Sequence, residues 1–581
     1  MDVRQTPKSH GFRRAAVAMA VCAAATAAVL VPAVLTPAAE EVPPSAVSPP
    51  PRTAPKPVRP ARTPGAGLGP YYRQRIHWTP CAGTLHVQGT DTYRRRFECG
   101  TVTVPLDYGH PGNGEIRLAV NRMRTTGPGR RLGSLLLNFG GPGEPVVAVL
   151  PDMAGFFTGP AASYDLVGVD PRGTGGSSPV VCGPGVAMTV NIAEPPAQVV
   201  ADQRAKNATC GTYSGKLLPW VGTPDAARDM DVVRAALGED KLNYMGFSYG
   251  TTLGANYAHQ FPTRVGRFVL DSVVDPTHDP EQEALAQTAS EQAVLDDFLA
   301  DCAARGADCP LGGTGQSAAD ALTALYQDAK AQGGAGEFVQ AIRNGLYSRA
   351  SWPAIRQALA QLEQGDATGI EQLAGGGANG LPAAVAPHRS APADGPGRSD
   401  DPGGAEDPGR FGGSHRPDPP NRSGPADRNR SGPARSDPDP DAVQAGIAMR
   451  AISCRDTAAR YDADAFTRAL PAFLKASPLF GEANATGLLS CAGWPVAGDN
   501  TSRQVGAAQA PPMLLVATTD DPATPYDGAA HMARALGNGS TVLTLRGSGH
   551  GAYVTPSACV HRNVDAFLLH GVRPAKGTTC S

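Results

Sequence analysis

The hydrophobic residues of this chain fall into short apolar runs that alternate with longer amphipathic stretches. Runs typical of buried strands lie at 115–123, 134–139, 165–169, 242–245 and 267–270, and further along at 513–517 and 541–545. Helical patterns separate them, as at 223–237, where Thr223 suits an N-cap and Pro224 the first helical position. Such alternation predicts an α/β fold with a mostly parallel, doubly wound sheet.

A serine stands at the junction between one of these strands and a helix. Gly246-Phe247-Ser248-Tyr249-Gly250 follows the run 242–245 and precedes a helical stretch at 251–260. This context is typical of a nucleophile elbow, in which flanking glycines make room for a strained turn that exposes the serine Oγ. The motif alone is weak evidence, because a chain with 69 glycines in 581 residues contains it by chance about once in two such chains. A serine between glycines is otherwise a turn residue.

Three further segments supply the other parts of an acyl-transfer site, each directly after a strand-like run. Gly140-Gly141-Pro142-Gly143 follows 135–139, and the N–H of Gly141 can act with that of Tyr249 as an oxyanion hole. Asp520 and Asp521 follow 513–517, and His550 follows 541–545 in a glycine-rich loop. Serine, acid and histidine thus occur in the chain order of an α/β-hydrolase.

These residue types suit one another chemically. A serine hydroxyl is a poor nucleophile at neutral pH, so an imidazole must accept its proton and a carboxylate must orient that imidazole. A histidine in a glycine-rich loop and an aspartate before proline are, taken singly, ordinary loop and turn residues. Their joint occurrence after separate strands favours the catalytic interpretation.

Together these motifs resemble those of a known family. The motifs at 138–143, 165–175, 246–251 and 521–525 are similar to those of the secreted bacterial tripeptidyl aminopeptidases, α/β-hydrolases related to the prolyl aminopeptidases. The resemblance extends from about residue 77 to 580. It implies Ser248 as nucleophile, Asp521 as acid and His550 as base, with Asp520 as the alternative acid, because the family's acid lies four residues before the proline matching Pro525.

The resemblance also implies a domain organisation. The hydrolase core is expected at 71–275 and 511–581, with a helical lid at 276–510 inserted between the sixth and seventh strands. In the family, this lid restricts the active site to chain ends. Residues 375–441 depart from the pattern: they are rich in Gly, Pro, Asp, Arg and Ser, lack apolar residues, and are predicted to be a disordered low-complexity insert.

The N-terminal residues predict export. Basic residues precede an apolar stretch at 15–35, which is typical of a signal peptide ending near residue 38; an uncleaved membrane anchor is the alternative. Residues 39–70 are rich in proline and alanine and predict an unfolded linker. A formal net charge of −2 gives no indication of a nucleic-acid partner. Once the signal peptide is removed, no stable membrane association is expected.

Cysteine usage agrees with an exported protein. Of the 11 cysteines, ten remain when Cys22 in the leader is set aside. We predict that they pair with their neighbours along the chain: Cys81 with Cys99, Cys182 with Cys210, Cys302 with Cys309, Cys454 with Cys491, and Cys559 with Cys580. Their spacing does not fit a zinc site, and no cofactor or metal is implied.

The sequence therefore predicts a secreted serine hydrolase, an exopeptidase that releases short peptides or amino acids from peptide substrates with free N-termini. A carboxylesterase or thioesterase of the same fold is one alternative, since the triad does not distinguish acyl groups. A non-catalytic binding protein on a hydrolase fold is the other, because fold alone does not establish catalysis.

Overall fold

A computed structural model of the chain describes residues 67–81, 96–375 and 440–581. The predicted signal peptide, most of the predicted linker and nearly all of the predicted low-complexity insert lie outside these residues. The first described helix, α1 (Gly69–Arg73), begins close to the expected start of the core. Tyr71 in this helix is buried, and its hydroxyl donates a 2.9 Å hydrogen bond to Glu115, so the helix is attached to the sheet.

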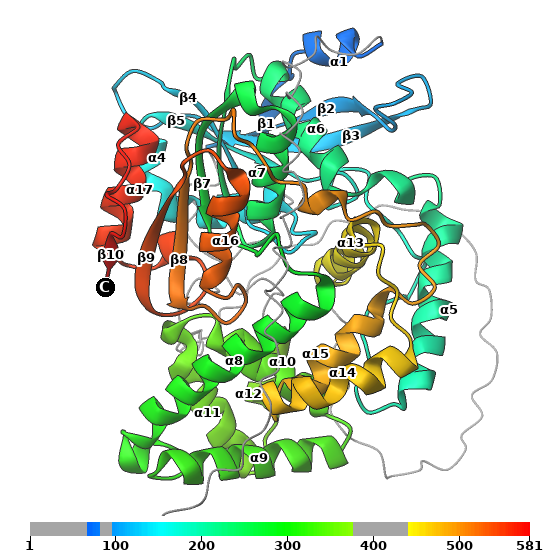
Figure 1. Cartoon of the computed structure of the whole chain (residues 1–581), viewed down its shortest axis with the longest axis vertical. Helices are drawn as coiled ribbons and strands as arrows, with labels where there is room; N and C mark the ends of the chain where they lie inside the picture. Colours follow the sequence, from blue (N-terminus) through cyan, green and yellow to red (C-terminus); the bar gives the residue numbers. More distant parts are fainter. Residues whose placement is uncertain (1–66, 82–95, 376–439) are drawn as a thin grey trace, which may run out of the picture. The chain divides into compact units, whose positions relative to one another are not determined.

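The described strands form one mixed sheet in the order β1-β2-β3-β5-β4-β6-β7-β8-β9-β10 (Figure 1). The pairs β1–β2, β2–β3 and β3–β5 are antiparallel, and all others, from β5–β4 to β9–β10, are parallel. The mostly parallel sheet predicted from the sequence is thus present. The strands are β1 (Thr79–Pro80), β2 (Phe97–Pro105), β3 (Glu115–Met123), β4 (Gly133–Asn138), β5 (Tyr164–Val169), β6 (Leu242–Phe247), β7 (Val265–Asp271), β8 (Leu514–Asp520), β9 (Thr541–Ser548) and β10 (Thr579–Cys580).

Helices cover both faces of this sheet, because the apolar strand residues point alternately to either side. In β4, Leu136 packs into one core with side chains of α6 (Thr223–Ala236), α7 (Tyr249–Gln260) and α16 (Asp527–Leu536). Its neighbours Leu135 and Leu137 pack into the opposite core with α3 (Val146–Met153) and α17 (Ala558–His570). The short helix α4 (Thr158–Ala161) also belongs to this second face.

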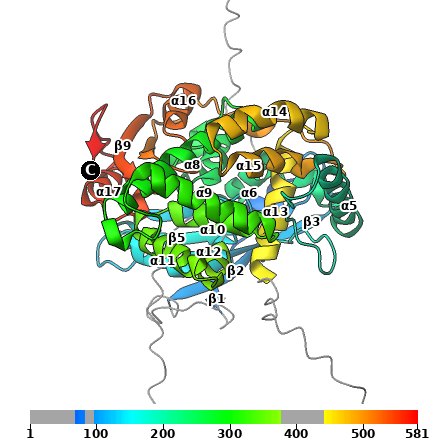
Figure 2. The ribbon, with the colours of Figure 1, turned by 90° about the horizontal axis from the view of Figure 1, so that it is seen from below.

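A long helical segment separates β7 from β8, which are the sixth and seventh strands counted from β2. Part of it, from α8 to α12, has its own apolar core, which includes Phe298, Phe338 and Trp352. Figures 1 and 2 show these helices gathered at one end of the sheet, below the strands in the view of Figure 1. The helices are α8 (Pro280–Ala303), α9 (Gly315–Ala331), α10 (Ala335–Leu346), α11 (Trp352–Glu363), α12 (Thr368–Gly375), α13 (Pro440–Asp456), α14 (Ala463–Ala476) and α15 (Gly481–Gly487). Among the described residues, none of the helices is both long and apolar enough to cross a membrane.

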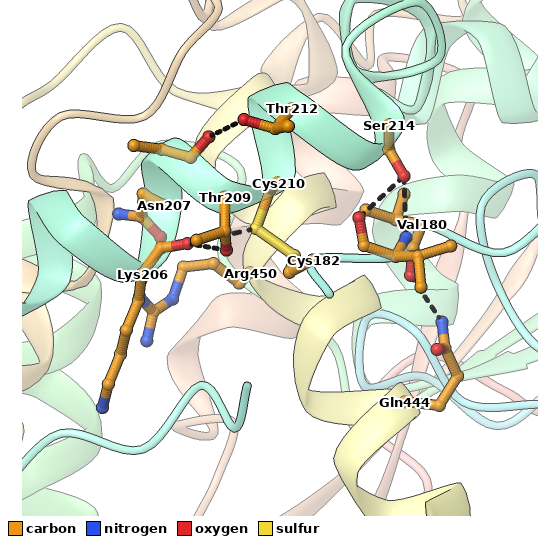
Figure 3. Close-up of a disulfide and its surroundings, with 12 residues drawn as sticks. Val180, Cys182, Lys206, Asn207, Thr209, Cys210, Thr212, Ser214, Gln444 and Arg450 are labelled. Carbon is orange, nitrogen blue, oxygen red and sulfur yellow. Dashed lines mark hydrogen bonds between the residues drawn. A yellow bond between two sulfur atoms is a disulfide. The ribbon is translucent and has the colours of Figure 1, made fainter. Parts of the chain in front are cut away.

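All five predicted disulfides are present: Cys81–Cys99, Cys182–Cys210, Cys302–Cys309, Cys454–Cys491 and Cys559–Cys580. Figure 3 shows the second of them, which ties the loop after β5 to α5 (Pro196–Ser214). Two side chains of α13 bind the same region. Gln444 donates a 3.0 Å hydrogen bond to the carbonyl oxygen of Val180, and Arg450 donates one of 2.6 Å to Gln203. This disulfide therefore lies where α5 and α13 meet.

Candidate active site

Ser248 occupies a strained turn between β6 and α7. Its backbone has φ 54° and ψ −126°, a conformation that non-glycine residues rarely adopt. The flanking glycines are required: a Cβ on Gly246 would lie 2.5 Å from the carbonyl oxygen of Gly250, and one on Gly250 would lie 2.7 Å from Oδ1 of Asn138. Ser248 itself is half-buried, and its N–H donates a 3.1 Å hydrogen bond to Asp271 on the neighbouring strand. These features are those of a nucleophile elbow.

Asp521 and His550 lie together at the same edge of the sheet. Nδ1 of His550 is 2.8 and 3.0 Å from the two carboxylate oxygens of Asp521. Asp521 follows the end of β8 and His550 follows the end of β9, strands that pair in parallel, so their carboxyl ends meet. The N–H groups of Ala523 and Thr524 each donate a 2.9 Å hydrogen bond to Oδ1 of Asp521. They fix the carboxylate against the imidazole.

The electrostatics of this pair favour its charged form. Burial alone disfavours the carboxylate, but the charge and hydrogen bond of His550, with the N–H of Thr524, hold the pKa of Asp521 below its usual value. Burial likewise disfavours a charged imidazole, yet the charge and hydrogen bond of Asp521 raise the pKa of His550 above its usual value. An imidazolium formed here is therefore stabilised.

The carboxylate of Asp520, the alternative acid, has a different partner in the structure. Its carboxylate accepts a 3.0 Å hydrogen bond from the hydroxyl of Thr519, and its main-chain oxygen accepts one of 3.0 Å from Gly549. The imidazole of His550 bonds to Asp521 instead. The two aspartates differ because Asp520 is the last residue of β8, whereas Asp521 begins the following turn. The N–H groups of that turn donate to the carboxylate of Asp521.

The glycine-rich loop after β4 passes close to the elbow. Gly140 and Gly141 have φ values of 96° and 101°, which glycine adopts without strain. A Cβ on Gly140 would lie 2.9 Å from Cβ of Ser248 and 3.3 Å from the main-chain nitrogen of Tyr249, so only glycine allows this approach. Tyr249 is the first residue of α7, where N–H groups have no acceptor within the helix. The loop thus brings Gly140 against Ser248 and Tyr249, and Gly141, the predicted oxyanion donor, is the next residue of this loop.

Comparisons with known proteins agree with this geometry. Residues 135–312 match the model of the alpha/beta hydrolase fold, and residues 477–580 match that of the TAP-like proteins. The tripeptidyl aminopeptidase of Streptomyces lividans is 30% identical over 88% of this chain and 87% of its own length. The chain belongs to the tripeptidyl aminopeptidase-like family of α/β-hydrolases. It is accordingly a serine hydrolase, as the sequence predicts.

Other relatives of this tripeptidyl aminopeptidase-like protein carry different names. Serine protease Hip1 of Mycobacterium tuberculosis is 31% identical over 88% of the chain and 92% of its own length. A protein of the same organism named carboxylesterase B is 31% identical over 90% of the chain and 92% of its own length. The chain is therefore similar both to proteins named as peptidases and to a protein named as an esterase.

The helical segment of this tripeptidyl aminopeptidase-like chain reaches the candidate base directly. The main-chain N–H of His550 donates a hydrogen bond to the carbonyl oxygen of Tyr347, which follows α10. The Tyr347 ring also stands edge-on to the imidazole. Nearby, the hydroxyl of Ser548 donates a 3.0 Å hydrogen bond to Asp297 of α8. The base loop is thus supported from the helical side.

A cavity of about 640 Å³ lies between the core and these helices. Pro142 and Tyr249 line it from the core side. Its helical side is lined by residues of α8, α10, α13 and α15, among them Glu283, Arg343 and Asp456. A cavity of this size next to the elbow has room for a few residues of a substrate.

Tyr249 also takes part in a buried hydrogen-bond network with Thr223, a residue whose predicted role as a helix cap was wrong. The hydroxyl of Thr223 bonds both to the Tyr249 hydroxyl and to the carboxylate of Asp456 in α13. Thr223 was expected to cap α6, but the N-cap is Gly222 and Thr223 is already helical. Burial raises the pKa of Asp456 to about 7, and its hydrogen bonds with Thr223 oppose this shift. The threonine hydroxyl is used for a long-range contact instead of a local cap.

Two residues without a predicted role support the site. The predicted strand stopped at residue 270, yet Asp271 ends β7 and Ser272 follows it. The Asp271 carboxylate accepts hydrogen bonds of 3.0 and 2.8 Å from the N–H groups of Ala552 and Tyr553, and the Ser272 hydroxyl accepts one of 2.8 Å from Gly551. They hold the chain just after His550. The sequence contained a signal for this role, because two polar residues directly follow the apolar run 267–270, as the predicted site residues follow their own strands.

Proposed function

We propose that this protein is a secreted exopeptidase that releases short peptides or amino acids from free N-termini through an acyl-enzyme. The observation that carries the proposal is the Asp521–His550 pair, buried at the sheet edge where the elbow presents Ser248. The relatives named tripeptidyl aminopeptidase and serine protease support a peptide as the acyl donor.

In this proposal, Ser248 Oγ attacks the scissile carbonyl carbon while Nε2 of His550 accepts its proton. Asp521 holds Nδ1 of the imidazole and stabilises the imidazolium. The N–H groups of Gly141 and Tyr249 donate to the oxyanion. When the C–N bond breaks, His550 returns the proton to the departing amine, leaving an ester on Ser248. Water, deprotonated by the same imidazole, then hydrolyses that ester and restores the serine hydroxyl.

We assign α8–α15 the role of a lid that restricts the site to chain ends. The cavity beneath these helices is bounded on both sides, which favours a substrate terminus over the middle of a folded chain. Four carboxylates line it, and a free α-amino group is a cation that needs such a partner in a buried site. They are Asp275, Asp279, Glu283 and Asp456.

Secretion remains part of the proposal. Five disulfides are typical of proteins that fold outside the reducing cytosol, and they agree with the leader predicted at residues 1–38. Analysis of the N-terminus of the protein recovered from culture medium tests this, with a start after about residue 38 as the expected result.

The decisive experiment offers one peptide with a free and with an acetylated N-terminus and identifies the products by mass. We expect cleavage of the free form only, at a fixed distance from its end, and no cleavage by Ser248→Ala. Ser178→Ala is the matched control, because Ser178 also has a positive φ (49°) but lies outside the site. Cleavage of both forms at internal positions would contradict an exopeptidase.

An esterase is the second candidate, favoured by the relative named carboxylesterase B. Hydrolysis of a simple ester that depends on Ser248, together with no cleavage of either peptide, would establish it. A fluorophosphonate probe addresses the remaining alternative, a binding protein. Failure of the probe to label Ser248 in the intact protein would favour that alternative.

A further inference from the structure

Three side chains converge at one point outside the proposed triad, and two of them, Asp275 and His278, line the cavity. Asp275 and His278 belong to the loop between β7 and α8, and His531 belongs to α16. Nδ1 of His531 bonds to Oδ2 of Asp275, and Nε2 of His278 lies 3.5 Å from the same oxygen. The three atoms all lie within 4.8 Å of one another. In the part of the chain that the structure describes, no other three His, Cys, Asp or Glu side chains meet in this way.

The surrounding groups hold these atoms in orientations that suit a metal ion. The N–H and hydroxyl of Thr277 donate hydrogen bonds of 2.8 and 2.6 Å to Oδ1 of Asp275, so Oδ2 faces the imidazoles. Nδ1 of His278 lies 3.0 Å from the carboxylate of Glu283, and in the tautomer that donates its Nδ1 proton to Glu283, the lone pair of Nε2 is free to bind a metal ion. Histidine ligands of metal ions usually have such a carboxylate behind them.

Close packing of α16 on the loop brings in the third side chain. A Cβ on Gly528 would lie 2.8 Å from the carbonyl oxygen of Val273 and 3.2 Å from the nitrogen of Asp275. Glycine thus allows the first turn of α16 to contact the loop directly. His531 lies three residues further along, on the same side of the helix, above Asp275.

We propose that Asp275, His278 and His531 bind one divalent transition-metal ion of the Zn²⁺ class. Two imidazole nitrogens and one carboxylate oxygen suit Zn²⁺, whereas Ca²⁺ and Mg²⁺ prefer oxygen ligands. Ligand atoms around a tetrahedral zinc ion are about 3.3 Å apart, given bonds of about 2.0–2.1 Å. The His278–Asp275 separation of 3.5 Å already fits, all three ligand atoms lie within 4.8 Å of one another, and coordination requires His531 to move away from Asp275.

Asp275 and His278 both line the cavity, so an ion bound to them would lie at its wall. A water molecule or a Lewis base of a ligand in the cavity completes the coordination. The ion uses neither Ser248 nor His550, but it occupies Asp275, one of the four carboxylates considered above for the substrate's amino group, so metal binding is measured directly and not through peptidase activity. A sequence signal existed in Asp275-x-x-His278, but His531 is separated from it by more than 200 residues.

The test measures metal binding by the full secreted protein, stripped with chelator and titrated with Zn²⁺ in equilibrium dialysis. Co²⁺ serves as a spectroscopic probe, since its visible absorption reports tetrahedral coordination. We expect one saturable equivalent in the wild type and its loss in His531→Ala and Asp275→Asn. Glu283→Gln removes the carboxylate behind His278 and is expected to weaken binding roughly 10- to 100-fold.

His110→Ala is the matched control. His110 pairs with Asp107 at 2.8 Å, as His531 pairs with Asp275, but it belongs to no group of three ligands, and its loss should leave zinc binding unchanged. The His531 side chain is one-third exposed, so its replacement is not expected to unfold the protein, which circular dichroism checks. Absence of saturable binding in the wild type, or equal binding in His531→Ala, would overturn the proposal.

Discussion

The main-chain N–H of His550 donates a 2.9 Å hydrogen bond to the carbonyl oxygen of Tyr347, a residue more than 200 positions earlier in the chain. The Tyr347 ring also stands edge-on to the imidazole, with ring centres 5.3 Å apart and planes at 87°. The proposed base is thus oriented by Asp521 from the core and by Tyr347 from the helical segment. Besides its proposed role as a lid, the segment therefore contacts the imidazole and supports its position.

Replacing Tyr347 by alanine tests this task. The variant keeps the main-chain hydrogen bond but removes the ring that packs against His550. We expect kcat to fall roughly 10- to 100-fold with a smaller change in KM, because small displacements of a catalytic group are costly. Tyr347→Phe keeps the ring and should remain close to the wild type. Equal loss in both variants would mean that the hydroxyl, and not the ring, is required.

Paired substitutions of Asp521 and Asp520 distinguish the two neighbouring carboxylates. Asp521→Asn removes the charge that orients His550 and is expected to lower kcat by about 10⁴-fold. Asp520→Asn should change kcat less than tenfold, since its carboxylate bonds to Thr519. Steady-state kinetics on one peptide substrate measure both. The opposite ranking would assign the acid to Asp520.

The pH dependence of kcat/KM follows from the electrostatics of the imidazole. His550 must be neutral to accept a proton. Burial lowers the pKa of His550, but the charge and hydrogen bond of Asp521 and the charge of Asp271 outweigh this effect and raise the pKa above 6.5. We therefore expect kcat/KM to rise with pH, with its midpoint above 6.5. Asp271→Asn removes one of these charges and should move the midpoint to lower pH. An unchanged midpoint in this variant would contradict the electrostatic explanation.

The buried ion pair between Arg172 and Asp229 makes a stability prediction. Two guanidinium nitrogens of Arg172 donate hydrogen bonds of 2.7 and 2.5 Å to the carboxylate, and both side chains are buried. Arg172→Ala leaves the carboxylate buried without its cation, which should lower the free energy of unfolding by about 3–5 kcal/mol. Urea unfolding measures this loss.

A neighbouring pair provides the control for this prediction. Arg228 contacts Asp225 at 2.6 Å, but its side chain is 41% exposed. Because solvent screens such a pair, Arg228→Ala should cost less than about 1 kcal/mol. Equal costs for the two arginines would show that burial does not determine the strength of the Arg172 contact.

Disulfide removal is expected to depend on the length of the closed loop. Cys182 and Cys210 are 28 residues apart, whereas Cys302 and Cys309 are 7 apart. From loop-closure entropy, double serine variants should lose about 3.6 and about 2.4 kcal/mol of unfolding free energy. Urea unfolding under non-reducing conditions compares them. A larger loss for the short loop would indicate that native contacts, such as those between α5 and α13, outweigh chain entropy.

Much of this protein was predictable from its sequence because the informative features are local. The elbow around Ser248 depends on glycines two residues away, and each apolar run forms a strand or part of one. Neighbouring cysteines form the disulfides because segments close in the chain fold together. Asp521 and His550 were predictable as a pair because both follow strands, and the carboxyl ends of adjacent parallel strands meet at one edge.

Contacts between distant segments were decided by the tertiary structure alone. Thr223 bonds to Asp456 in place of capping α6, since a buried carboxylate 233 residues away offers its hydroxyl a stronger partner. Tyr347 likewise contacts His550, and His531 contacts Asp275, only because distant segments pack together. Local propensity determines which turn or helix a residue favours. Which distant side chain becomes its neighbour depends on how the helices pack on the sheet, and no short stretch of sequence encodes that.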